Sequence, residues 1–254
     1  MEHTPVLSVN GICKNFGGVV AAENIAFDLF PGEIMGLIGP NGAGKTTLLN
    51  MLSGIYPVDA GTIVFQSKDI TTMPSHERAR LGISRTFQTP RFLSRSSIRD
   101  NLLLGTDLGE QTGYLRSFFS KQSTAFDAEL KTLLEIADVH IEWDSDIGGV
   151  PYGQRKRLEI IRAMLSHPKV LLVDEPAAGL NAKELEHSVA LIRYAVSQGV
   201  AVILIEHQMD MIMNVCNKIL VLNFGRPIGY GSPREVSSNP EVIAAYLGRR
   251  REHA

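Results

Sequence analysis

A glycine-rich segment constrains the fold of this chain more than any other feature. Residues 39–46 read Gly-Pro-Asn-Gly-Ala-Gly-Lys-Thr and match the pattern G-x-x-x-x-G-K-[ST]. Glycines allow consecutive backbone N–H groups to point inward, and a helix that follows adds the positive end of its dipole. The apolar run Ile34–Ile38 predicts a buried strand before the segment, and Thr46–Leu52 predicts a helix after it. The sequence therefore predicts a strand–loop–helix unit that binds phosphate groups.

The side chains of this loop favour the phosphates of a nucleotide. Lys45 supplies a positive point charge to the β- and γ-phosphates, which gives it a catalytic role, and Thr46 supplies a hydroxyl group for Mg²⁺. We predict nucleotide contacts from the loop residues Gly39, Pro40, Asn41, Gly42, Ala43, Gly44, Lys45, Thr46 and Thr47.

Short apolar runs alternate with longer amphipathic stretches along the chain. This alternation is typical of a parallel α/β sheet. The region from Thr89 to Ser145 has few β-branched runs and more helical patterning, which predicts a helical subdomain inserted into the α/β body. Strands are expected at Val6–Val9, Ile25–Phe30, Gly61–Phe65, Val170–Val173, Val200–Ile205 and Ile219–Leu222, and helices at Ala125–Ala137 and Glu184–Val196.

Composition excludes several classes of protein. The 25 Lys and Arg residues against 27 Asp and Glu give a net charge of −2, and a dedicated nucleic-acid binder needs a surplus of cations. The two cysteines are too few for a disulfide framework, which favours a reducing compartment. No apolar run approaches the ~20 residues that span a bilayer, and the N-terminus lacks the pattern of a secretory signal. We expect a cytosolic protein that could dock on a membrane through a partner.

An acidic pair directly follows the predicted strand Val170–Val173. The carboxyl end of a parallel strand is where α/β folds place their ligands. Asp174 could reach Mg²⁺ directly or through a water, and Glu175 could accept a proton from an attacking water or orient it. The alternative is an ordinary polar strand end, which the phosphate-binding loop upstream makes the weaker interpretation.

Together with further motifs, these features resemble the ATP-binding subunits of ABC transporters over nearly the whole chain. The stretch 85–88 (Arg-Thr-Phe-Gln) is similar to the family's Q-loop, 150–157 occupies the place of its signature, and 178–181 is similar to its D-loop. The resemblance implies that Gln88 senses Mg²⁺ and the transporter subunit, and that His207 is the switch histidine at the γ-phosphate. It also implies that Phe16 stacks on adenine and that Tyr152, Gly153 and Gln154 approach the nucleotide of another subunit.

The resemblance carries a fold and partners with it. It implies a P-loop NTPase with a mostly parallel core sheet, an antiparallel β subdomain and an inserted helical subdomain, as one domain over 1–254 with the insertion at about 89–160. It implies ATP and Mg²⁺, a second ATP-binding subunit that is identical or different, transmembrane permease subunits and, indirectly, an extracytoplasmic solute-binding protein. The chain would then be peripheral at the cytoplasmic face of the plasma membrane, with no nucleic acid among its partners.

Within the family, the chain is most similar to the ATPases of branched-chain amino-acid importers. The supporting stretches are 85–88, the Tyr-Gly-Gln form of the signature, 176–181 and 242–248. Importers of urea, other amides or aromatic compounds share much of this pattern. An ABC-type ATPase that works on DNA or ribosomes, a P-loop kinase or GTPase, and a non-catalytic nucleotide sensor stay open as alternatives. We find no Asn-Lys-x-Asp segment of the kind that reads guanine.

The signature departs from the family at Pro151, where serine is common. The resemblance implies that this serine's hydroxyl contacts the γ-phosphate across the dimer. Proline has neither a hydroxyl nor a backbone N–H. A charge-assisted hydrogen bond contributes about 1.5–3 kcal/mol, so we expect a weaker signature contact at this site.

Overall fold

The computed structural model describes residues 4–106 and 124–247. Its centre is a six-stranded sheet in the order β10-β9-β3-β8-β7-β6, in which all neighbours are parallel except β9 and β10. The strands are β3 (Ile34–Ile38), β6 (Ile83–Arg85), β7 (Val170–Asp174), β8 (Ala201–Ile205), β9 (Lys218–Asn223) and β10 (Arg226–Gly231).

The central strands read as continuous apolar runs because both faces of the sheet are covered. Every residue of β3, β7 and β8 is buried. Successive side chains point to opposite faces, so Leu171 and Val173 enter one apolar core while Val170 and Leu172 enter the other. The strands predicted at Val170–Val173, Val200–Ile205 and Ile219–Leu222 are confirmed, each within one residue at either end.

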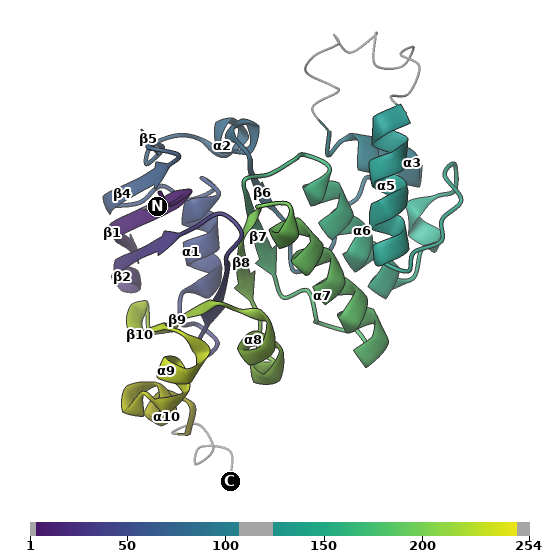
Figure 1. Ribbon diagram of the computed structural model, residues 1–254. Coiled ribbons are helices and arrows are strands. Elements are labelled where there is room, and N and C mark those ends of the chain that lie inside the picture. The colour runs from purple at the N-terminus through teal and green to yellow at the C-terminus, as the bar shows by residue number, and fades with distance from the viewer. Residues whose placement is uncertain (1–3, 107–123, 248–254) are drawn as a thin grey trace.

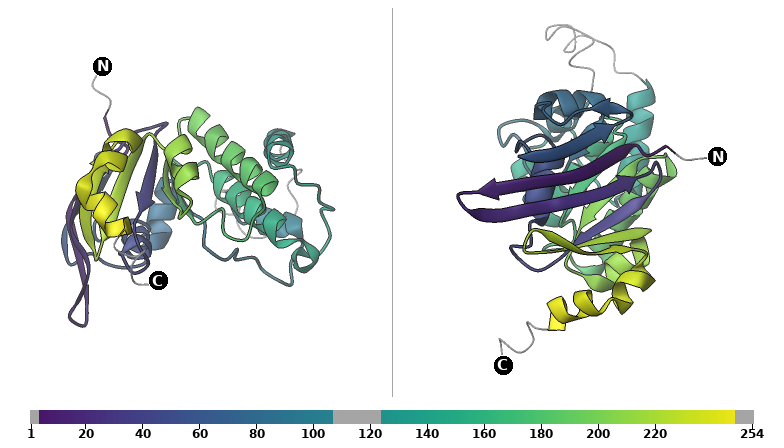
Figure 2. Two further views of the ribbon diagram at one scale, coloured as in Figure 1. Left: turned by 90° about the horizontal axis from the view of Figure 1, so that it is seen from below. Right: turned by 90° about the vertical axis from the view of Figure 1, so that its left-hand side faces the viewer.

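A second sheet is antiparallel and has the order β2-β1-β4-β5. It comprises β1 (Leu7–Phe16), β2 (Val19–Leu29), β4 (Ala60–Phe65) and β5 (Lys68–Asp69), and β1 and β2 form the outer face of the molecule in the right-hand view of Figure 2. The predicted strands Val6–Val9 and Ile25–Phe30 are only the first part of β1 and the last part of β2. Shifts of register between Val9 and Ile12 interrupt the alternation of burial, which hides the full length of both strands from pattern reading.

One helix lies between the two sheets, and other helices cover the opposite face of the central sheet and continue to one side of it (Figure 1). α3, α5 and α6 pack together beside α7, away from the antiparallel sheet, as the left-hand view of Figure 2 also shows. The helices are α1 (Lys45–Leu52), α2 (Ser75–Leu81), α3 (Ile98–Leu103), α5 (Thr124–Ile136), α6 (Tyr152–Met164), α7 (Ala182–Ser197), α8 (Met209–Val215), α9 (Pro233–Ser238) and α10 (Pro240–Leu247), with a 3-10 turn η1 at Ile147–Gly149.

The predicted fold class is confirmed: a mostly parallel α/β core, an antiparallel β sheet and a group of helices between β6 and β7. The boundary of the insertion at about 89–160 and the single domain over 1–254 stay predictions, since part of both lies outside the described residues. None of the helices that the structure describes is long and apolar enough to cross a membrane.

One buried guanidinium fixes the end of the helix that follows the phosphate-binding loop. Arg78 of α2 is 1% exposed, and its Nη1 donates to the carbonyls of Met51 and Leu52 at 2.7 and 2.9 Å. Its Nε and Nη2 donate to the carbonyls of Met73 and Thr71 at 2.9 Å each. Arg78 thereby satisfies carbonyls at the end of α1 that have no partner within the helix.

We therefore expect Arg78→Leu to lower the free energy of unfolding by about 2–4 kcal/mol, because several buried carbonyls lose a charged donor. Arg80, exposed on the same helix, supplies the control. Arg80→Leu is expected to change the free energy of unfolding by less than about 1 kcal/mol. Urea denaturation measures both variants, and equal effects would contradict this role for Arg78.

Candidate nucleotide site

The phosphate-binding loop joins β3 to α1 and depends on glycine at two close approaches. Gly39 has φ +151°, and a Cβ there would overlap the carbonyl oxygen of Leu222 in β9. Gly44 has φ +99°, and a Cβ there would overlap the carbonyl oxygen of Ala21 in β2. The backbone of the loop therefore lies directly against both sheets, and side chains at these positions would push it away.

The lysine of the loop is buried inside it. Lys45 begins α1 and is 6% exposed. Its Nζ donates to the carbonyls of Gly39 at 2.7 Å and Pro40 at 3.0 Å. Thr46 is exposed and Thr47 half-buried in the first turn of the same helix. The ammonium is thus held within the ring of loop backbone, beside the N-terminus of a helix eight residues long.

Asp174 at the end of β7 is a buried carboxylate with a buried cation beside it. Its Oδ2 lies 3.1 Å from Nη2 of Arg85, and the two side chains are 6% and 7% exposed. Burial raises the pKa of Asp174, and the charge of Arg85 opposes that rise. Arg85 also donates to Oδ1 of Asn50 in α1 at 2.6 Å. One guanidinium therefore ties β6, β7 and α1 together behind the phosphate-binding loop.

Glu175 lies where three parallel strands end. Its Oε1 is 2.8 Å from Nε2 of His207, which follows β8, and its Oε2 accepts a hydrogen bond of 2.8 Å from Nε2 of Gln88, which follows β6. The carboxyl ends of β6, β7 and β8 meet at one edge of the sheet because these strands are parallel neighbours. The structure thus brings together Gln88, Glu175 and His207. In the sequence, Gln88 lies 87 residues before Glu175 and His207 lies 32 residues after it.

A further carboxylate holds the backbone around this cluster. Glu206 is 4% exposed, and its two oxygens accept the N–H groups of Ala177 at 2.6 Å and His207 at 3.1 Å. Burial raises the pKa of Glu206, while these two N–H groups lower it. Sequence reasoning did not identify Glu206, although its place between a buried strand and His207 was available as a signal.

Phe16 has its own aromatic surroundings at the end of β1. Its ring is 42% exposed and meets the ring of Tyr56 edge-on, with centroids 5.3 Å apart. The Nζ of Lys14 lies 5.3 Å from the centroid of Phe16 and is paired with Asp59 at 2.7 Å. An exposed, laterally supported ring is suited to stacking on a base. The role of Phe16 stays a prediction.

The segment that resembles the family signature packs against residues 178–181 of the same chain, which resemble the D-loop. Tyr152 and Gly153 begin α6, and Pro151 is the N-cap residue, with φ −54° and no side-chain cap. The ring of Tyr152 lies over Gly179, and a Cβ on Gly153 would overlap the carboxylate of Glu184. Gln154 is half-buried in the same turn. The predicted site residues therefore form separate groups: the loop with Lys45, Asp174 with Arg85, Glu175 with Gln88 and His207, Phe16 with Tyr56, and Tyr152–Gly153 with the D-loop.

Farther along, α6 holds the backbone that follows Gln88. Oε1 of Glu159 accepts the N–H of Arg91 at 3.3 Å, and Nη1 of Arg162 donates to the carbonyl of the same residue at 2.6 Å. Glu159 is 2% exposed, and burial raises its pKa to about 7. An open groove of about 490 Å³ lies beside this segment. Its lining includes Arg85, Phe87, Leu104 and Arg162.

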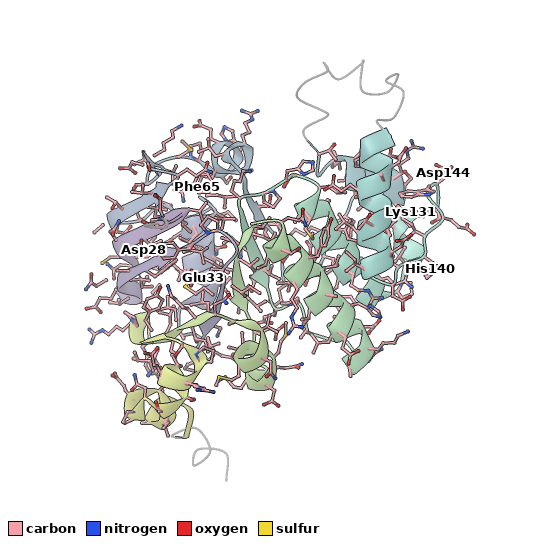
Figure 3. The ribbon with its side chains drawn as sticks, in the orientation of Figure 1. Asp28, Glu33, Phe65, Lys131, His140 and Asp144 are labelled. Carbon is pink, nitrogen blue, oxygen red and sulfur yellow. The ribbon has the colours of Figure 1, made fainter. Side chains whose placement is uncertain are left out.

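A larger cavity of about 800 Å³ belongs to a different part of the molecule. It lies between α5 and the segment that follows it, and its lining includes Lys131, His140 and Trp143. Figure 3 shows Lys131 and His140 on the helical side of the molecule, across from Asp28 and Glu33. None of the predicted site residues lines this cavity.

The comparisons with known proteins give the family. A sequence model for the protein family described as "ABC transporter" matches residues 22–178. The chain belongs to this family. A second model, described as "branched-chain amino acid ATP-binding cassette transporter", matches residues 226–252.

Relatives match over nearly the whole chain. The chain is 40% identical to the high-affinity branched-chain amino acid transport ATP-binding protein LivG of Escherichia coli K12, over 96% of this chain and 98% of that protein. It is 38% identical to BraF of Pseudomonas aeruginosa, with the same description and the same coverage. Among solved structures, the ADP conformation of the ATP-binding cassette MJ1267 matches with a TM-score of 0.81 and 30% identity, covering 96% of this chain and 99% of that chain.

The position of Pro151 generates a prediction about the ABC signature. A serine at this N-cap can accept an N–H of the first turn of α6 and can offer its hydroxyl to a phosphate. We expect Pro151→Ser to leave the ATPase rate unchanged or to raise it by up to about a hundredfold, which is the upper value of one charge-assisted hydrogen bond. Pro151→Ala is the control without a hydroxyl, and steady-state phosphate release measures both. A large fall in both variants would show that the proline is structurally required.

Proposed function

We propose that this chain is the ATP-hydrolysing subunit of an ABC importer for branched-chain or related amino acids or amides. The observation that carries the proposal is Glu175, held between His207 and Gln88 at 2.8 Å each at the sheet edge where the strand before the phosphate-binding loop also ends. A carboxylate so placed is suited to accept a proton from water. Membership of the ABC family and the names of the relatives LivG and BraF support the choice of transported solute.

The phosphate-binding loop would bind the triphosphate. Its backbone N–H groups and the Nζ of Lys45 offer positive charge to the phosphate oxygens, and the dipole of α1 adds to it. In the resulting arrangement, Lys45 offsets charge on the β- and γ-phosphates while the bond between them breaks. Phe16, supported by Tyr56, supplies the apolar face for the adenine ring.

Three residues would hold the magnesium ion that accompanies ATP. Thr46, Asp174 and Gln88 offer a hydroxyl, a carboxylate and an amide oxygen, and Mg²⁺ is usually bound by one or two carboxylates together with substrate phosphates. The donor set fits, since all three are oxygen ligands and Asp174 sits beside the loop through Arg85 and Asn50. When bound, the ion neutralises negative charge on the phosphates. Gln88 also donates a hydrogen bond to the carboxylate of Glu175.

Hydrolysis would proceed by attack of water on the γ-phosphorus in line with the leaving oxygen. Glu175 accepts the proton of this water through its carboxylate, the bond from the γ-phosphorus to the bridging oxygen breaks, and ADP and phosphate result. Gln88 and His207 hold the two oxygens of Glu175, which limits how the carboxylate can turn. The ring of His207 is 47% exposed and can turn towards the γ-phosphate.

A second ATP-binding subunit would complete each site. The start of α6 at Pro151 and Tyr152 is exposed, and α6 is 13 residues long, so its N-terminus can face the phosphates bound by the other subunit. ATP binds the closed dimer better than ADP does, because only the γ-phosphate bridges the two halves. Hydrolysis therefore shifts the population towards the open dimer. The second subunit is either a copy of this chain or a related one.

Transmembrane permease subunits would dock beside Gln88 and the helical insertion. The groove lined by Phe87, Leu104 and Arg162 lies beside the segment that follows Gln88. Helix α6 holds the main chain of this segment at Arg91. Opening and closing of the dimer would move the permeases, and a solute-binding protein would deliver the solute on the other side of the membrane. The chain would work at the cytoplasmic face of the membrane.

A non-catalytic nucleotide sensor is the second candidate, and Pro151 is the observation that favours it. Without the hydroxyl of a serine, the signature offers one hydrogen bond fewer to the γ-phosphate. Measured turnover of ATP by the wild-type chain distinguishes a sensor from a transport ATPase.

The proposed role of Glu175 predicts the behaviour of Glu175→Gln. We expect ATP to bind with a Kd near that of the wild type, turnover to fall by roughly a hundredfold to ten-thousandfold, and a closed dimer to accumulate with ATP. Calorimetry, phosphate release and size-exclusion chromatography measure these quantities. Glu142→Gln, at an exposed position, is the matched control. Unchanged turnover in Glu175→Gln would exclude Glu175 as the base.

Import is tested in the cell that carries the gene. Deletion of the gene is expected to abolish uptake of radiolabelled leucine at low concentration, and a copy of the wild-type gene restores it. A copy with Lys45→Ala is expected not to restore uptake, because the loop loses its cation. Normal leucine uptake in the deletion strain would contradict the proposed solute. It would not bear on the proposed ATPase reaction, which the phosphate-release assay of Glu175→Gln tests separately.

A further inference from the structure

A buried lysine on α6 lies next to the proposed catalytic carboxylate and has no role in the mechanism above. Lys156 is 3% exposed. Its Nζ donates to the main-chain carbonyl of Glu175 at 2.6 Å, and the same oxygen accepts the N–H of Ala178 at 3.3 Å. Lys156 therefore contacts the main chain of Glu175, whereas Gln88 and His207 contact its carboxylate.

The backbone of Glu175 is in a conformation that needs support. Its φ is +48°, in the left-handed region that residues other than glycine adopt rarely. Its N–H donates to the carbonyl of Ile205 in β8 at 3.0 Å. The peptide groups on either side of Glu175 are therefore fixed from two directions, by β8 through the N–H and by Lys156 through the carbonyl. This conformation aims the carboxylate at Gln88 and His207.

The burial of Lys156 is itself costly. Loss of hydration lowers the pKa of its ammonium, and the charges of Glu159, Glu206, Glu175 and Asp174 oppose that effect. An apolar side chain of similar length would fill the same space without this cost. What the ammonium adds is a charge-assisted hydrogen bond to the carbonyl of Glu175 and a positive charge among four carboxylates.

We propose that Lys156 is a positioning residue for ATP hydrolysis, which fixes the main chain of Glu175 so that its carboxylate meets the attacking water. The inference rests on the proposed function. Lys156 lies one turn after the start of α6, and its Nζ is 5.9 Å from the centroid of the Tyr152 ring. The first turn of α6, which resembles the family signature, is therefore followed directly by a side chain that holds the backbone of Glu175 within the same chain.

The first test separates catalysis from binding. We expect Lys156→Met to lower kcat for ATP hydrolysis by about tenfold to a hundredfold, since a small displacement of a catalytic group has effects of this size. KM and the Kd for ATP are expected to stay within about twofold, because Lys156 contacts none of the loop residues that would bind ATP. Lys156→Arg, which retains the charge and a donor, is expected to recover part of kcat.

The matched control is Lys131→Met, the same substitution at a side chain that is 78% exposed on α5 (Figure 3). Its kcat is expected to equal that of the wild type. Melting temperatures of all variants show whether a fall in kcat reflects unfolding. Should Lys156→Met fail to fold, Lys156→Gln, which keeps a donor and loses the charge, is measured in its place with the same expectation.

A double-mutant cycle identifies the residue through which Lys156 acts. In the Glu175→Gln background, Lys156→Met is expected to cause no further fall in turnover, because the group that it positions has gone. Equal losses in both backgrounds, an unchanged kcat, or a rise in Kd that accounts for the whole loss would each overturn the proposal. A wild-type chain that hydrolyses no ATP would overturn the proposed function and this role together, whereas wild-type turnover with an unaffected Lys156→Met would overturn this role alone.

Discussion

Parallel pairing of neighbouring strands is the constraint on which the rest of the site depends. β3, β8, β7 and β6 are hydrogen-bonded in that order and run in one direction, so their carboxyl ends meet at one edge. The residue after each strand is thereby carried to the same place: Gly39, Glu206 with His207, Glu175, and the segment that leads to Gln88. The long intervals of sequence between these residues become contacts of 2.8 Å because the sheet has this register.

Buried cations stabilise the negative charge that gathers at this edge. Arg85 pairs with Asp174, and Lys156 lies among Glu159, Glu206, Glu175 and Asp174. Burial raises the pKa of both Asp174 and Glu206, which means that desolvation disfavours their ionised forms. A positive charge nearby favours ionisation, and each of the two cations also makes a hydrogen bond that fixes its position. Electrostatic balance and geometry therefore come from the same side chains.

Features that depend on neighbouring residues in sequence could be predicted, and those that depend on distant partners could not. The loop at 39–46, the pair Asp174–Glu175 and the buried strands are local patterns, and the structure has them in the predicted places. The full length of β1 was missed because register shifts after Val9 break its alternation. The partnership of Arg85 with Asp174 and the buried position of Lys156 were also missed. A basic run such as 155–157 is typical of an exposed helix face, but tertiary packing buries Lys156 and Arg157.

Helix α6 has both kinds of feature: one that the sequence predicts and others that depend on distant partners. The N-cap of α6 is Pro151, where the family commonly has serine, and this difference can be recognised from the sequence. The second turn of α6 carries Lys156, and its contact with Glu175 can be recognised only from the structure. Farther along the helix, Glu159 and Arg162 contact the main-chain N–H and carbonyl of Arg91, which lies three residues after Gln88. A rigid helix with contacts to Glu175 and to the Gln88 segment makes the positions of these two groups interdependent. Pro151 and the contacts of Lys156 and Glu159 therefore bear on different properties of one helix. Pro151 bears on the contact that we expect with a second subunit, and Lys156 and Glu159 fix the backbone within this chain.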